Sequence, residues 1–255
     1  VDKAGNSITK TSGTYYIDKV NPTASFTPNS HTTWTNGTVS VKVNVSDTLS
    51  GVKRWRWRVS TDNGATYDAW RGYIDGNKEA TIVLDVEGVR RIQVEVEDIA
   101  GNVYTLTSGI YNIDKTMPAV NEQGISGDLY VNGNTYWIKQ NGKINIRIRA
   151  NDYLSLLESM ILQLESQTDN YRQDFNFSNN LSSIVKDSQE IDFISGTKTY
   201  ESADKKIREA TFTVSPRVHG KEYTASVWMR DYAGNIRNFY STGLKFKVDG
   251  KAPTL

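Results

Sequence analysis

The chain has 255 residues and balanced charges, with 30 Lys and Arg against 29 Asp and Glu and a net charge of +1. This balance gives no electrostatic reason to expect a nucleic-acid or membrane partner. Cysteine is absent, which excludes disulfides, thiol nucleophiles and zinc sites built on Cys, and leaves oxygen ligands for any metal.

The sequence also lacks the common catalytic motifs. It contains no His-Glu-x-x-His, no glycine-rich phosphate loop and no Ser-His-Asp order, and its two histidines, His31 and His219, have no metal-ligand spacing. No run of 18 apolar residues is present. We therefore expect no enzyme activity, no nucleic-acid binding and no membrane span in this segment.

A five-residue motif occurs three times and divides the chain into repeats. Asp2-Lys-Ala-Gly-Asn6 returns as Asp98-Ile-Ala-Gly-Asn102 and as Asp231-Tyr-Ala-Gly-Asn235, each followed by a β-rich run and a linker that ends in proline. The first two copies are 96 positions apart, which is one module length, and the next interval is 133. Matching segments place 9 of the additional residues early in the second module and 25 in an excursion at about 166–208.

This repeat predicts two complete domains with partial ones at the ends. Residues 1–18 correspond to the terminal hairpin or strand of a preceding repeat, and residues 251–255 to the start of a following linker. The first complete domain covers 19–115, and the second covers 116–250 with its insertion at about 166–208. Residues 1–18 have no core of their own, so we expect this strand to add to a sheet edge in its own chain or in a neighbour.

Apolar residues alternate with polar ones in several segments of both domains, as at 39–45, 92–96, 144–148 and 225–229. A period of two is typical of half-buried strands. Several short strands per module, without βαβ order, favour an antiparallel sandwich of two sheets. The predicted fold is all-β, with tandem immunoglobulin-like (Ig-like) antiparallel β-sandwiches of which the second has an insertion.

The basic and aromatic run at 53–58 has the composition of a polyanion-binding patch. Its alternation favours a structural role, because Trp55 and Trp57 then face the core while the arginines between them face outward. On the neighbouring strand the outward positions carry Glu95 and Glu97. Opposite charges across a strand pair contribute about 0.2 to 1 kcal/mol.

Residues 154–165 are ambiguous between helix and strand. Leu154, Leu157, Ile161 and Leu164 fall on helical spacing, and Leu, Glu and Met are good helix formers. The repeat, however, aligns this segment with the alternating run of the first module, which predicts a strand. Further along, the excursion could hold a short helix around 181–186.

The Asp-x-Ala-Gly-Asn turn and the linker Ile113-Asp-Lys-Thr-Met-Pro118 resemble the bacterial Ig-like repeats that occur in tandem in large extracellular surface proteins and adhesins. The third linker, Val248-Asp-Gly250, departs from the pattern. The resemblance implies a secreted or cell-surface location, neighbouring repeats as partners, and a non-catalytic role as a structural or adhesive spacer. Two alternatives remain open: a module that binds a host receptor or glycan through the excursion, and an accessory region of a secreted enzyme.

Six aspartates are the candidate metal ligands, three for each complete domain. In an Ig-like sandwich the linker enters beside two of the loops, so a linker aspartate meets two loop aspartates. The predicted groups are Asp18 with Asp47 and Asp98, and Asp114 with Asp152 and Asp231.

Three interpretations of these aspartates are open. Their side chains can serve only the backbone turns, they can together bind Ca²⁺, which prefers carboxylate and carbonyl oxygens, or Lys19 and Lys115 can neutralise them. Among the aromatic residues, which include Trp34, Trp70, Tyr73 and Trp137, we expect most to lie in the core. Trp228 is the one placed on an outward strand face, where a flat ring could hold a sugar.

Overall fold

The computed structural model describes residues 1–77, 79–166, 172–177 and 190–251. These residues hold the strands β1 to β19 and no helix, so the predicted all-β fold class is confirmed. No helix of the described part is long and apolar enough to cross a membrane. The short helix expected around 181–186 lies outside the described residues.

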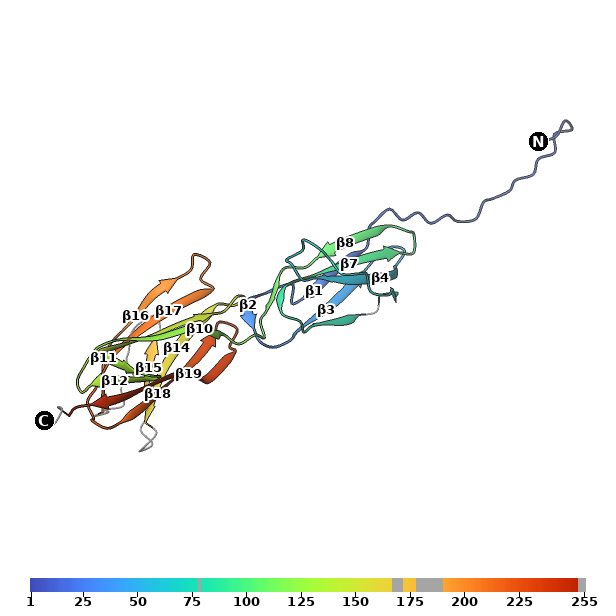
Figure 1. Ribbon diagram of the computed structural model, residues 1–255. Helices are drawn as coiled ribbons and strands as arrows, with labels where there is room; N and C mark the ends of the chain where they lie inside the picture. Colours follow the sequence, from blue (N-terminus) through green and yellow to red (C-terminus); the bar gives the residue numbers. More distant parts are fainter. Residues whose placement is uncertain (78, 167–171, 178–189, 252–255) are drawn as a thin grey trace. The chain divides into compact units, whose positions relative to one another are not determined.

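The chain divides into two compact units. The first contains Val1–His31, Ser40–Leu84 and Val89–Ile110, and the second contains Thr32–Val39, Asp85–Gly88 and Tyr111–Leu255. Each unit is built of mostly antiparallel sheets that face each other across an apolar core, with one parallel pair, β12 with β19, in the second unit (Figure 1).

One sheet of the first unit has the order β1-β3-β6, formed by Thr23–Thr27, Val39–Ser46 and Ala80–Leu84. In the other, β7 (Gly88–Asp98) pairs with β8 (Val103–Thr107) and β4 (Val52–Ser60), and β4 pairs with the short β5 (Ile74–Asp75). Fully buried side chains from both sheets form the core: Val41, Val43, Trp55, Ile92, Val94 and Val96.

The arginines of β4 pair with β7 as the alternation predicted. Arg54 lies opposite Glu97 and Arg56 opposite Glu95 in the strand register. Their ion pairs measure 2.7 and 2.8 Å, while Trp55 between them is fully buried. Arg54 and Arg56 are therefore paired within the sheet, whereas Arg58 donates to the neutral side chain of Gln93 at 2.8 Å.

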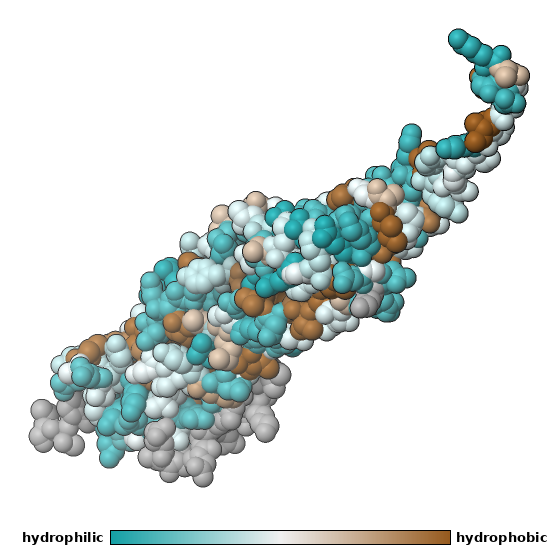
Figure 2. All heavy atoms as spheres, turned by 90° about the vertical axis from the view of Figure 1, so that its right-hand side faces the viewer, coloured by the Kyte–Doolittle hydropathy of each residue, from teal (hydrophilic) through white to brown (hydrophobic). Residues whose placement is uncertain are grey.

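Residues 1–17 form no strand, and within the described part of the chain no sheet takes them as an added strand. Tyr15, Tyr16 and Ile17 are 79%, 94% and 77% exposed. The expectation that this segment adds to a sheet edge of its own chain is therefore wrong. Elsewhere, the view in Figure 2 shows hydrophobic residues scattered among hydrophilic ones.

In the second unit, β10 (Ala119–Gly127), β13 (Ile144–Asn151), β17 (Ile207–Pro216) and β16 (Ile191–Glu201) form one sheet in this order. The facing sheet has the order β11-β12-β19-β18-β14-β15, with bounds Leu129–Asn132, Thr135–Lys139, Ile236–Asp249, Glu222–Asp231, Leu157–Ser166 and Arg172–Phe177. The strands β2 (His31–Thr35) and β9 (Tyr111–Ile113) pair with each other. Isoleucines from β13 and Phe212 from β17 pack on Leu162, Val227 and Phe246.

The repeat correctly predicted a strand in the ambiguous segment 154–165. This strand is β14, which runs from Leu157 to Ser166. It pairs with β18 on one side and β15 on the other. Met160, Leu162 and Leu164 alternate into the core and are at most 1% exposed. Two strand partners and a buried face override the local helix propensity.

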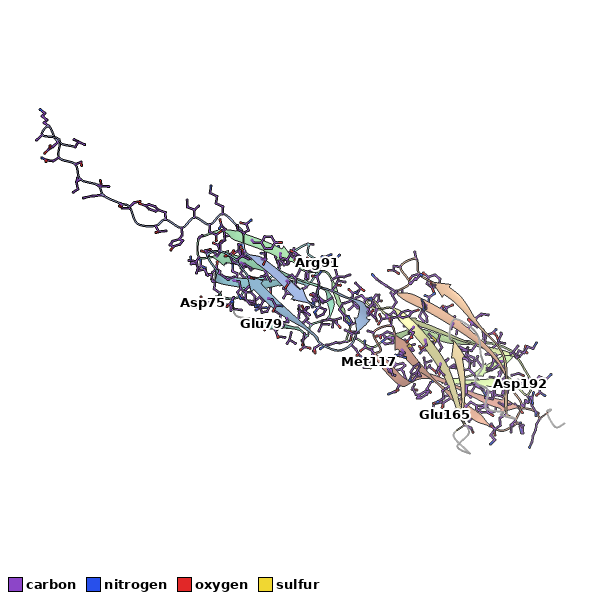
Figure 3. All side chains as sticks on the ribbon, turned by 180° about the vertical axis from the view of Figure 1, so that it is seen from behind. Asp75, Glu79, Arg91, Met117, Glu165 and Asp192 are labelled. Carbon is purple, nitrogen blue, oxygen red and sulfur yellow. The ribbon has the colours of Figure 1, made fainter. Side chains whose placement is uncertain are left out.

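The described parts of the excursion at about 166–208 extend the sandwich. They contribute β15 to the edge of one sheet and β16 to the edge of the other. Figure 3 labels Glu165 on β14, beside β15, and Asp192 on β16, which belong to different sheets. The insertion thus widens both sheets.

Candidate metal centres

The first acidic centre brings together three aspartates of the first unit. Asp18 precedes β1, Asp47 follows β3, and Asp98 ends β7. One carboxylate oxygen from each lies within 4.8 Å of the other two. Asp98 is buried, whereas Asp18 and Asp47 are partly exposed.

The second acidic centre has the same construction in the second unit, but it is closed to solvent. Asp114 follows β9, Asp152 follows β13 and Asp231 ends β18. Their carboxylate oxygens also lie within 4.8 Å of one another. The three residues are 0%, 3% and 0% exposed. The structure therefore brings all six candidate residues together in the two groups that the repeat predicted.

The linker aspartate is fixed in the same way in both centres. Asp18 Oδ2 accepts a hydrogen bond from the backbone N–H of Ser50 at 3.0 Å. Asp114 Oδ2 accepts the corresponding bond from Ser155 N–H at 2.9 Å. In each case the linker is tied directly to the loop that carries the second aspartate.

The asparagine that ends the repeated motif makes a second link to the linker. Asn102 bonds through its backbone N–H and its side chain to the two carboxylate oxygens of Asp98, at 2.8 and 2.7 Å. Its Nδ2 also donates to the carbonyl oxygen of Asp18 at 3.3 Å. The second centre repeats these three bonds with Asn235, Asp231 and Asp114.

The remaining copy of the motif, at residues 2–6, shows that the turn can form without the acidic cluster. Asp2 accepts hydrogen bonds from Ala4 N–H and from both N–H groups of Asn6, although all three residues are exposed. The turn therefore forms without a linker aspartate, a loop aspartate or burial. The structural interpretation of the motif explains each turn, but not why three carboxylates meet.

The loop aspartate leaves one oxygen free for another partner. Asp47 Oδ1 accepts hydrogen bonds from Leu49 N–H and Gly51 N–H, at 3.1 and 2.7 Å. Its Oδ2 is buried and has no hydrogen-bond partner within the described residues. In the second centre, Asp152 Oδ1 accepts the two corresponding bonds. The buried hydroxyl of Ser155 is likewise unpartnered among the described residues.

Burial makes the two centres differ electrostatically. Burial, followed by the nearby Asp114 carboxylate, raises the pKa of Asp152 to about 6. Burial also raises the pKa of Asp231. In the open centre, a hydrogen bond from the Ser50 side chain and one from Val20 N–H lower the pKa of Asp18.

Lys115 does not neutralise the second centre, so the lysine interpretation is wrong for this residue. Its Nζ forms an ion pair with Asp85. The adjacent Thr116 hydroxyl donates to Glu87 at 2.8 Å. The ion pairs found among the described residues include none of the six aspartates.

The donor set suits Ca²⁺. It consists of carboxylate and backbone carbonyl oxygens, which are the ligands that this ion prefers, and it contains no nitrogen or sulfur ligand. The unpartnered Asp47 Oδ2 is an acceptor of the kind that a cation would satisfy. Asp18, Asp47 and Asp98 could hold one ion, and Asp114, Asp152 and Asp231 another.

Sequence reasoning identified the aspartates but missed the groups that hold them in place. Ser50 and Ser155 fix the linker carboxylate, and Asn102 and Asn235 fix the linker carbonyl. Their signal was present in the repeat, because both complete modules have Ser three positions after the loop aspartate and Asn four positions after the turn aspartate.

Comparisons with known proteins agree with the modular β-fold. The sequence matches no protein-family model and no curated protein sequence. Among solved structures, fibronectin-III-like modules of CbhA from Clostridium thermocellum are similar over 89% of this chain and 95% of theirs, at 11% identity and a TM-score of 0.32.

In two other solved structures, the match to this chain covers only part of the solved chain. A Ca²⁺-stabilised adhesin of an Antarctic bacterium matches 99% of this chain over 56% of its own, at 16% identity and a TM-score of 0.39. Dimeric latent PorU from Porphyromonas gingivalis matches 86% of this chain over 22% of its own, at 14% identity and a TM-score of 0.31. Similarity at this level carries no information on ligands or activity. The described residues of the chain form an all-β protein of two sandwich-like units.

Proposed function

We propose that the chain is a non-catalytic spacer region of an extracellular bacterial surface protein, whose linkers are made rigid by Ca²⁺. The observation that carries this proposal is the convergence of three carboxylates in the same arrangement in both units. In the second unit all three are buried and no ion pair neutralises them among the described residues. The repeated modules and the absence of catalytic motifs support a structural role.

Electrostatic repulsion explains why such a centre needs a cation. Two unit charges about 4 Å apart repel by about 4 kcal/mol at an effective dielectric constant near 20. A proton on one carboxylate relieves part of this repulsion, which is, after burial, the second cause that raises the pKa of Asp152. A divalent ion would relieve it for all three and would hold Asp114 against the loops that carry Asp152 and Asp231.

Thermal unfolding with and without Ca²⁺ tests this proposal. We expect a free Ca²⁺ concentration about 100 times the Kd to raise the Tm by about 5 °C or more, because the ion binds only the folded state. EDTA should reverse the shift, and Mg²⁺ should reproduce little of it because Mg²⁺ retains its water shell.

The control is Asp2→Asn, which changes the same motif where it stands alone. This variant should keep the full response to Ca²⁺, whereas Asp152→Asn and Asp47→Asn should each lose part of it. An equal Tm in EDTA and in Ca²⁺ would contradict the proposal.

A further inference from the structure

The second unit contains a hairpin that the first unit lacks. The 9 residues that lengthen the early part of the second module fall at the hairpin formed by β11 and β12. Its loop is Gly133-Asn134, and Gly133 has a φ of +59°, as the first position of a two-residue hairpin loop with glycine requires. Figure 1 shows the hairpin beside β19, with which β12 pairs.

This hairpin exposes two aromatic rings next to each other. Tyr130 on β11 lies directly opposite Trp137 on β12 in the strand register. Tyr130 is 70% exposed and Trp137 is 36% exposed, so Trp137 is not among the aromatic residues that lie in the core. Directly opposed residues of an antiparallel pair have Cβ atoms about 5 Å apart, so the two side chains leave the same face of the hairpin next to each other.

Several aromatic rings of the first unit are engaged by arginine side chains. In the first unit, the guanidinium of Arg54 lies 4.0 Å from the ring centroid of Tyr73, and that of Arg58 lies 4.4 Å from that of Trp70. Among the described residues, the cation nearest to the Trp137 ring is the Lys247 ammonium, 5.7 Å from the ring centroid, near the limit of a cation–π contact. Tyr130 makes no ring or cation contact within the described residues.

The two rings line a groove of about 920 Å³, within the size range of small-molecule sites. Polar residues on its walls include Asp128, Asn132 and Asp249. Asp128 Oδ2 accepts a bond from Lys143 N–H, and Asp249 Oδ1 one from Lys251 N–H. The second oxygen of each carboxylate makes no hydrogen bond within the described part of the chain. The groove therefore combines flat apolar faces with free hydrogen-bonding groups.

We propose that this groove binds a neutral carbohydrate chain. A pyranose ring has an apolar C–H face, which suits the rings of Tyr130 and Trp137, and a rim of hydroxyl groups, which suits Asp128, Asn132 and Asp249. Lys139 and Lys251 also line the groove and balance the charges of Asp128 and Asp249, which favours a neutral ligand, while the polar walls disfavour an apolar peptide. This site is separate from both acidic centres, so its failure would leave the calcium proposal intact.

Titration with defined oligosaccharides tests the proposal on the 255-residue chain. After a glycan array, the tetrasaccharides of cellulose, xylan, mannan and chitin are titrated by calorimetry and by tryptophan fluorescence. We expect at least one neutral glycan to bind, and Tyr130→Ala and Trp137→Ala each to weaken that binding by at least about tenfold.

The matched control is Tyr73→Ala, which removes a tyrosine that is 42% exposed in the first unit. It should leave glycan affinity unchanged. The Tm of each variant shows whether it folds. The glycan affinity of Asp128→Asn, which keeps the shape of the side chain, tests the groove at a second residue.

Three results would overturn the proposal. The first is an array and titrations with no binding, and the second is glycan binding that neither ring variant weakens. The third is self-association of the chain that the ring variants abolish, because the groove would then be covered by a second copy.

Discussion

At the scale of single residues, Asp152 shows the electrostatic cost of bringing three carboxylates together in the second centre. It is 3% exposed, lies near two other carboxylates, and has its pKa raised to about 6. A carboxyl group whose pKa is higher in the folded state than in the unfolded state binds its proton more tightly when folded. Its contribution to stability is therefore greatest at low pH and falls as the pH rises from about 4 to about 6.

The variant Asp152→Asn tests the predicted direction of this pH dependence of stability. Without Ca²⁺, the wild-type chain should lose stability between about pH 4 and pH 6, and the variant should lose less, because its amide keeps the hydrogen-bond acceptor without the charge. At neutral pH in EDTA the variant should therefore unfold at a higher temperature than the wild type, and in Ca²⁺ the order should reverse. Denaturant titrations across this pH range measure both effects. A variant less stable than the wild type under all conditions would contradict the account.

Gly51 shows a backbone requirement at the other centre. Its φ is +84°, and its N–H donates to Asp47 at 2.7 Å. A side chain at this φ costs roughly 1 to 2 kcal/mol, although the space is open, since an added Cβ would lie 3.7 Å from Ile99. The second centre carries this cost at Leu156, whose φ is +74°.

We therefore expect Gly51→Ala to lower the free energy of unfolding by about 1 kcal/mol. Gly37→Ala is the control, because Gly37 has no positive φ and an added Cβ would have Thr35 Oγ1 at 3.5 Å. Urea unfolding of both variants measures the difference. Equal stability of the two variants would show that the left-handed conformation at Gly51 is not required.

At the scale of elements, period-two alternation predicted the strands with buried faces, including β3, β7, β13 and β18. The repeat then resolved β14, where local propensity favours a helix. The hairpin of β11 and β12 could not be predicted in the same way. The early part of the second module has 9 residues more than that of the first, and the exposure of Trp137 depends on its neighbours in space.

The strand assignment of β14 predicts a sharp contrast between adjacent residues. Leu162 is fully buried, whereas Ile161 is partly exposed. Leu162→Ala should lower the free energy of unfolding by about 2 to 5 kcal/mol, and Ile161→Ala by clearly less. Chemical denaturation measures both, and similar losses would contradict the strand orientation.

At the scale of the whole molecule, the two acidic centres contain the same set of hydrogen bonds. This repetition supports one shared role for both centres. The sequence located the six aspartates because spacing is conserved between its own modules. It could not show that Lys115 pairs with Asp85, or that burial closes only one of the two centres, because both depend on side-chain positions. These two findings favour a cation over a lysine in the second centre.

Calorimetric titration of the metal-free chain with Ca²⁺ tests the central claim most directly. The two acidic centres predict two ions per chain, and one ion after either Asp47→Asn or Asp152→Asn. Asp2→Asn should leave the stoichiometry unchanged. No binding heat at any accessible concentration, or a stoichiometry that neither centre variant changes, would contradict the account.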